Sequence, residues 1–74
     1  MENNIKQYRL AAGMTQSDLG LAIGITSSKP QAVISNYEKG IRSPGLHACR
    51  RIVMALHVAG ATMDSVFPVE LKQG

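Results

Sequence analysis

Three glycines divide the first forty residues into short segments, and this division limits what the chain can fold into. Gly13, Gly24 and Gly40 each follow a segment in which apolar residues recur every three or four positions. That spacing puts the apolar side chains on one side of an α-helix. A glycine just past the last turn commonly ends such a helix. The pattern predicts short helices over about residues 5–12, 16–23 and 30–39.

Residues that favour helix starts precede the first two segments. Asn3 or Asn4 is suited to cap the first helix, and Thr15 is suited to cap the second. Asp18 falls in the first turn of the second helix, where its charge suits the helix dipole. Gly20 lies inside this helix, where glycine costs about 1 kcal/mol relative to alanine. It is either tolerated there or allows the close approach of a neighbouring helix, and we favour the close approach.

Similar signals predict where the third and fourth helices begin. Ser28 is a candidate cap for the third helix, and Pro30 suits its first turn because a missing N–H does no harm there. Ser43 is a candidate cap for the fourth helix, with Pro44 at its first position. The apolar residues of the fourth helix form one inner stripe: Leu46, Cys49, Ile52, Val53 and Leu56.

A last short helix completes the prediction. Thr62 is suited to cap a helix over residues 63–67, and Pro68 stops it. The expected fold is all-α, with five short helices around one core. We expect this domain to occupy residues 1–68 and a tail to occupy residues 69–74.

The composition fits one small globular domain with positive charge. The chain has 74 residues, of which 45% are hydrophobic and 18% are charged, and its net charge is +3. Between Lys29 and Arg51, inclusive, stand five cationic residues and one acid, Glu38. Such a patch suits an acidic partner such as nucleic acid, although many basic domains bind none. With one cysteine and no apolar run near the roughly 18 residues of a membrane span, we expect a cytoplasmic protein that does not enter the membrane.

The third helix carries the candidate functional face. Ile34, Tyr37 and Glu38 share one side of this helix, and short polar side chains occupy the other. Glutamine and asparagine pair in two places with adenine, and serine bonds to several bases. The alternative is an ordinary solvated face, where the same residue types are common. The residues that would read bases in the DNA major groove are Gln31, Ala32, Ser35 and Asn36.

In order and spacing, these segments resemble the Cro/C1-type helix-turn-helix domains of phage repressors and small bacterial regulators. The resemblance covers about residues 5–67 and implies a five-helix, lambda-repressor-like fold. The matching pieces are Ile5-x-x-Tyr8-Arg9, Gly13-Met14-Thr15-Gln16-x-Asp18-Leu19-Gly20, Ile34-x-x-Tyr37-Glu38-x-Gly40, Pro44, Ala55-Leu56-x-Val58 and Thr62-x-Asp64.

The resemblance also implies roles. The helix from Gln16 would cross the DNA backbone, while the helix near Gln31 would enter the major groove by its N-terminal part. The family reads double-stranded DNA to regulate transcription, and a small repressor that binds an inverted repeat as a homodimer is the simplest form. Arg9 and Glu38 match a structural ion pair of the family. The implied phosphate contacts are Thr15, Gln16, Ser28, Lys29, Lys39, Arg42 and Ser43.

The chain departs from the family in two connections. Ten positions separate Gly24 from Ile34 where the family has about six, so about four extra residues lie around Thr26 to Pro30. This extension brings Ser28 and Lys29 toward the DNA. The connection between residues 58 and 62 is also about three residues longer than usual, in a region where many members dimerise. Candidate dimer contacts are Met54, Val58 and Met63. The alternative is that they are isolated apolar residues on the surface, which is normal for a soluble domain.

No other chemistry is indicated. His47 and His57 are ten residues apart and lack zinc-ligand spacing, so they are better explained as surface histidines. Cys49 lies on an apolar stripe without a base beside it, which indicates a buried structural thiol and not a nucleophile. We therefore expect no metal, no cofactor and no catalytic activity. The alternative function is a protein-interaction module on the same scaffold, such as an antitoxin or an adaptor that masks a protein partner.

Overall fold

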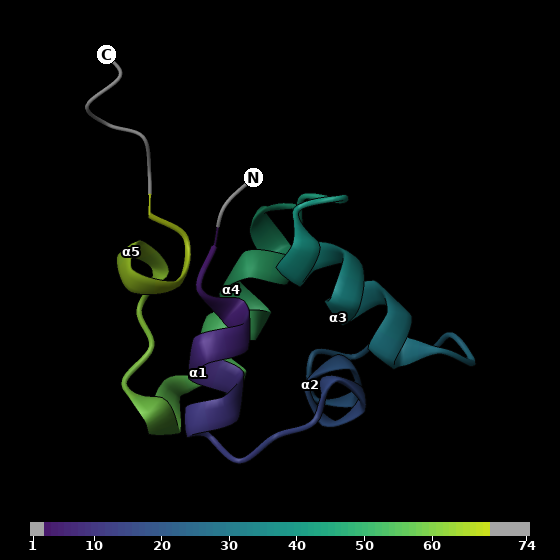
Figure 1. The fold of residues 1–74 in the computed structure, drawn as a ribbon, viewed down its shortest axis with the longest axis horizontal. Coiled ribbons are helices and arrows are strands. Elements are labelled where there is room, and N and C mark those ends of the chain that lie inside the picture. Colours follow the sequence, from purple (N-terminus) through teal and green to yellow (C-terminus); the bar gives the residue numbers. More distant parts are fainter. Residues whose placement is uncertain (1–2, 69–74) are drawn as a thin grey trace.

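The fold is an all-helical bundle, as the sequence predicts. The computed structural model describes residues 3–68 and contains no strand in that range. The elements, in chain order, are α1 (Ile5–Ala11), α2 (Gln16–Ala22), α3 (Pro30–Lys39), α4 (Leu46–Ala55), the 3-10 turn η1 (His57–Ala59) and α5 (Met63–Val66) (Figure 1). The expected tail over residues 69–74 lies outside the described residues. No helix of the described range is long and apolar enough to cross a membrane.

Each α-helix sends a fully buried aliphatic side chain into one core. Each of these side chains contributes about 1.5–3 kcal/mol by leaving water. Tyr8 and Tyr37 pack at the edge of the core, whereas Phe67 is buried within it. The five buried aliphatic side chains, one from each helix in chain order, are Ile5, Leu19, Ile34, Ile52 and Val66, all with 0% exposure.

Two helix starts are closed by reciprocal side-chain bonds at the predicted residues. The Thr15 hydroxyl accepts the backbone N–H of Asp18, and the Asp18 carboxylate accepts the backbone N–H of Thr15, both at 2.9 Å. Thr62 and Ser65 form the same box at the start of α5. Both caps satisfy N–H groups that a helix leaves unpaired at its first turn.

Three expectations about helix starts are wrong. Ser28 does not cap α3, because Lys29 is the residue before the helix and its own N–H donates to the Ser27 hydroxyl at 3.3 Å. Ser43 does not cap α4, which begins at Leu46 after Gly45. Pro44 lies before the helix and is buried, and it accepts the Cys49 thiol at its carbonyl oxygen.

The later start of α4 also removes Leu46 from the inner stripe. Leu46 is 59% exposed, while Cys49, Ile52 and Leu56 are buried as expected. The buried position beside Cys49 is occupied by Pro44.

Helices α2 and α3 approach each other closely at Gly20. A Cβ on Gly20 would lie 2.7 Å from the Cβ of Pro30 and 2.9 Å from its carbonyl oxygen. The expectation that Gly20 admits a neighbouring helix is therefore confirmed, and the neighbour is the first residue of α3. The connection between the two helices is exposed over residues 26–29 and extends away from the bundle (Figure 1).

The N-terminal asparagines fasten α1 to two other helices. The backbone N–H of Asn4 donates to the carbonyl of Val66, and its side-chain amide donates to the carbonyl of Ser65, both at 2.8 Å. Asn3 donates to the carbonyl of Tyr37 at 2.8 Å. Asn4 stands at the cap position of α1, but it is the Asn3 side chain that accepts the N–H of Ile5.

Candidate nucleic-acid interface

Helix α3 presents its polar side to solvent and buries its apolar side. Ile34 is fully buried, whereas Gln31 and Ala32, which lead the predicted base-reading set, are exposed. Ser35 and Asn36, one turn further on, are half-buried. The N-terminal half of α3 is therefore the part of this face that is most accessible to a partner.

The end of α3 is fixed by a Schellman motif, a paired set of hydrogen bonds around a left-handed residue. Gly40 has a φ of 76°, and its N–H donates to the carbonyl of Tyr37 at 3.1 Å. The carbonyl of Asn36 accepts the N–H of Ile41 at 3.0 Å and that of Arg42 at 3.3 Å. These bonds set the direction of the chain after α3, where Arg42 and Ser43 are exposed, as is Lys39 at the end of the helix.

A buried ion pair holds α3 against α1. Arg9 Nε donates to Glu38 Oε2 at 2.7 Å, and Arg9 Nη2 reaches Glu38 Oε1 at 3.4 Å. The two side chains are 8% and 7% exposed. Arg9 Nη1 also donates to the carbonyl of Met14 at 2.9 Å. The two residues whose pairing the resemblance implied are thus in direct contact.

Gln16 joins this network, which the sequence pattern did not indicate. Its side-chain amide donates to Glu38 Oε1 at 3.0 Å, so the same carboxylate binds the start of α2 and the last turn of α1. Gln16 and Glu38 are 22 positions apart, and no local spacing rule connects them. Because one amide N–H is used inside the protein, a phosphate contact by Gln16 must use its other N–H or its backbone N–H.

The extended connection places two predicted phosphate contacts directly before α3. Ser28 and Lys29 are both exposed, and Lys29 is followed by Pro30 at the first helical position. At the other end of this connection, Arg51 Nη1 donates to the carbonyl of Ile23 at 3.2 Å. This bond, which the sequence also did not indicate, ties the end of α2 to α4.

The charge between Leu19 and Met63 is almost entirely positive. From Leu19 to Met63 the only carboxylate is Glu38, and it binds Arg9 and Gln16. The Asp18 carboxylate lies just outside this range and is engaged with Thr15, whose backbone hydrogen bond lowers the pKa of Asp18. The cations therefore face solvent without a neutralising acid on the same stretch: Lys29, Lys39, Arg42, Arg50 and Arg51.

The remaining candidate residues are spread over other parts of the bundle. Cys49 is 8% exposed, and burial raises the pKa of its thiol. His47 and His57 are exposed. Within residues 3–68, no three histidine, cysteine or acidic side chains are grouped as metal ligands would be.

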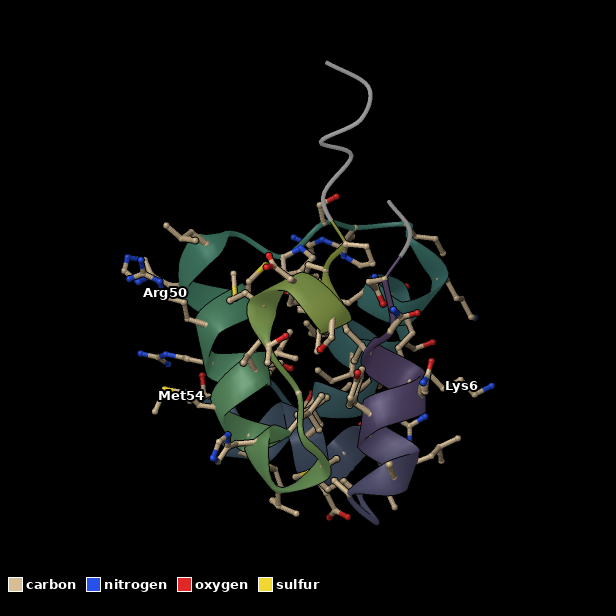
Figure 2. The ribbon with its side chains drawn as sticks, turned by 90° about the vertical axis from the view of Figure 1, so that its left-hand side faces the viewer. Lys6, Arg50 and Met54 are labelled. Atoms are coloured by element: carbon tan, nitrogen blue, oxygen red, sulfur yellow. The ribbon has the colours of Figure 1, made fainter. Side chains whose placement is uncertain are left out.

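The three candidate dimer contacts lie on α4, η1 and α5. Val58 is 80% exposed and Met54 is 75% exposed, whereas Met63 is 36% exposed. Helix α5 lies beside α4, and Met54 projects from the outer edge of α4 (Figure 2). These three apolar side chains are at least partly accessible, and their role in dimerisation stays a prediction.

Comparison with known proteins identifies one family. A family model described as helix-turn-helix matches residues 5–61. The match runs from α1 into the connection that follows η1, and it includes both α2 and α3. No curated protein and no solved structure gives a significant match.

Proposed function

This chain belongs to the helix-turn-helix family of the Cro/C1 type, whose members bind double-stranded DNA and regulate transcription, and we propose that it acts as a homodimeric repressor. Each subunit inserts the N-terminal half of α3 into the major groove. The operator is an inverted repeat, and bound dimers block access to the promoter. The proposal involves no catalytic step, no cofactor and no metal, and it places the protein in the cytoplasm with the DNA.

The observation that carries this proposal is the way α3 is held. Pro30 packs against Gly20 at one end of the helix, and Glu38 is bound by Arg9 near the other. A reading helix held at both ends presents its side chains in one geometry, which lowers the entropy lost on binding. In this geometry Gln31, Ala32, Ser35 and Asn36 read base edges.

The phosphate contacts come from the two ends of the same helix. Lys29 precedes α3, and Lys39, Arg42 and Ser43 end or follow it. Further contacts come from the extended connection and from the start of α2, at Ser28, Thr15 and Gln16. Each neutralised phosphate releases counterions, so the affinity falls as salt rises.

The polar character of α3 favours DNA reading over the alternative of a protein-interaction module. Its exposed residues are Gln31, Ala32 and Lys39, none of which is a large apolar side chain. A module that masks another protein through this helix needs a larger apolar patch there.

Dimerisation is proposed through three exposed apolar residues, Met54, Val58 and Met63. A two-fold dimer presents its two α3 helices to half-sites about 34 Å, or one helical turn of DNA, apart. Val58→Glu is expected to weaken self-association in sedimentation equilibrium without changing the helical content of the subunit.

The decisive experiment is the selection of bound sites from a random duplex library by the full chain, followed by salt titration of the best site. We expect enrichment of an inverted repeat whose half-sites lie about one helical turn, or a multiple of it, apart. Weak, salt-sensitive binding without any enriched sequence would contradict base reading.

A further inference from the structure

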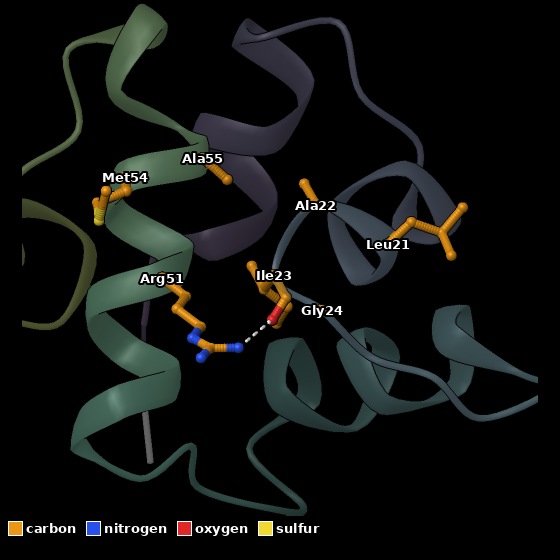
Figure 3. A pocket seen from close by; sticks show the side chains of 7 residues that line it. All are labelled: Leu21, Ala22, Ile23, Gly24, Arg51, Met54 and Ala55. Carbon is orange, nitrogen blue, oxygen red and sulfur yellow. Dashed lines mark hydrogen bonds between the residues drawn. The ribbon is translucent and has the colours of Figure 1, made fainter.

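A hollow of about 490 Å³ lies between the end of α2 and the second half of α4 (Figure 3). It is open to solvent, and none of the residues proposed to contact DNA lines it. The residues that line it are Leu21, Ala22, Ile23, Gly24, Arg51, Met54 and Ala55.

The walls of the hollow are apolar apart from one cation. Leu21 on α2 is 62% exposed and Met54 on α4 is 75% exposed. Figure 3 shows Leu21 and Met54 at the two outer edges of the hollow, with Ala22 and Ala55 between them and Arg51 reaching from α4 toward the end of α2. The guanidinium of Arg51 is held there by its bond to the carbonyl of Ile23, at 3.2 Å.

Within the described residues, no acid neutralises this cation. The lining contains no carboxylate, and Glu38, the only acid from Leu19 to Met63, is bound to Arg9. Arg50, the neighbour of Arg51 on α4, is also exposed (Figure 2). A guanidinium in a partly apolar site pairs well with a carboxylate, because two parallel N–H donors match its two oxygens.

The shape of the hollow selects the kind of occupant. A small ligand usually loses most of its surface to an enclosing pocket, which an open hollow does not provide. A nucleic-acid backbone needs a row of cations, whereas here a single guanidinium stands among apolar walls. A protein segment can place an apolar side chain in the hollow and cover its open side with neighbouring residues.

We propose that this hollow is a docking site for an acidic, amphipathic segment of a partner protein. An apolar side chain of the partner packs over Ala22 and Ala55, beside the edge formed by Leu21, and a neighbouring carboxylate binds the guanidinium of Arg51. Because the hollow shares no residue with the proposed DNA contacts, a DNA-bound subunit can hold this partner at the same time. Met54 also belongs to the proposed dimer contacts, so the test depends on Leu21 and Arg51.

The probe is a displayed library of random peptides, about a dozen residues long, selected against the full chain. We expect the enriched peptides to combine leucine, isoleucine, methionine or phenylalanine with a nearby aspartate or glutamate. On titration of such a peptide, amide NMR shifts should change mainly at residues 21–24 and 51–55. Binding should fall about tenfold or more in Leu21→Gln and in Arg51→Gln.

Two matched variants serve as controls. Leu10→Gln removes an apolar side chain of similar exposure, 58%, that does not line the hollow. Lys6→Gln removes a cation from the opposite side of the bundle (Figure 2). Both should bind the peptide like the wild type. Arg51→Lys keeps the charge. Thermal unfolding identifies any variant that unfolds because the bond to Ile23 is lost.

Several outcomes would overturn the proposal. These are the absence of any enriched peptide, enrichment of neutral or basic peptides, or wild-type binding by folded Leu21→Gln and Arg51→Gln. Loss of self-association in Leu21→Gln would assign the hollow to a second copy of this chain. Loss of duplex binding in folded Arg51→Gln would assign it to nucleic acid.

Discussion

The Cβ of Pro30 lies only 2.7 Å from the point where a Cβ on residue 20 would stand. Two helices that meet at a glycine can come closer than any side chain would allow. In this molecule the contact sets the position of the first residue of α3 on α2. The depth at which α3 presents its outer face therefore depends on residue 20.

Gly20→Ala is expected to destabilise the protein by about 1–2 kcal/mol. Overpacking costs about 1–3 kcal/mol, and the contact with the Pro30 backbone puts this site toward the upper end, while alanine regains about 1 kcal/mol of helix propensity. Urea unfolding measures the change. Gly45→Ala is the matched control, because a Cβ there meets nothing within 4 Å. Equal stability of Gly20→Ala and the wild type would contradict the close packing.

Glu38→Gln is expected to cost about 3–5 kcal/mol, because it leaves the Arg9 guanidinium buried without its counter-charge. Both side chains of the pair are more than nine-tenths buried. The double variant Arg9→Met with Glu38→Leu should recover much of the loss, since apolar residues often replace a buried pair without penalty. Urea midpoints of the single and double variants decide the matter, and a Glu38→Gln midpoint equal to the wild type would rule out a stabilising pair.

Asp18→Asn is expected to reduce stability at neutral pH and to lose this effect in acid. Hydrogen bonds from the Thr15 backbone N–H and side chain lower the pKa of Asp18 below its ordinary value of 3.8. A lowered pKa in the folded state means that the charged carboxylate stabilises the fold above pH 3.8. The contribution is lost as the pH falls through the folded-state pKa.

Melting temperatures between pH 7 and pH 2 test this prediction. The gap between wild type and Asp18→Asn should close as the pH decreases. Asp64→Asn removes an equal charge from the first turn of α5 without touching the Thr15 cap, and so controls for the change in net charge. A gap that is constant across the whole range would show that the charge of Asp18 is not involved.

Asn36→Ala is expected to weaken binding to the selected operator by about 1–3 kcal/mol and to leave binding to random duplex almost unchanged. The side-chain amide, which the proposal assigns to a base edge, is removed. The backbone carbonyl of residue 36, which accepts the N–H groups of Ile41 and Arg42, is kept. Equal losses on the operator and on random DNA would refute base reading by this residue.

Arg42→Ala is expected to weaken binding to both kinds of DNA and to lower the salt slope by about one. Arg42 follows the Schellman motif of α3 and is exposed. Lys6→Ala, on α1, is the control for an equal loss of charge. A salt slope that stays the same in Arg42→Ala would exclude Arg42 from the phosphate contacts.

The sequence identified two helix ends that depend only on neighbouring residues. The cap formed by Thr15 and Asp18 and the end of α3 at Gly40 follow from local chemistry, and the structure confirms both. The helical period also placed Ile34 on the inner side of α3, where it is fully buried. Gly20 indicated a close approach between helices, but only the structure shows which residue approaches it.

Features that depend on packing between distant segments could not be predicted in this way. Helix α3 begins where Pro30 meets Gly20, so the serine before it has no capping role. Helix α4 begins late because Pro44 is buried ahead of it. The bonds from Gln16 to Glu38 and from Arg51 to Ile23 join residues 22 and 28 positions apart.

The bonds of Asn4 to Ser65 and Val66 also have a consequence for how the protein is made. Asn4 leaves the ribosome 61 residues before Ser65, which at about 5–20 residues per second is a delay of about 3–12 s. Throughout that interval α1 has no α5 to be fastened to. The nascent chain therefore completes this domain only after Val66 has been synthesised. Until then α3 is part of a domain that lacks the contacts between α1 and α5.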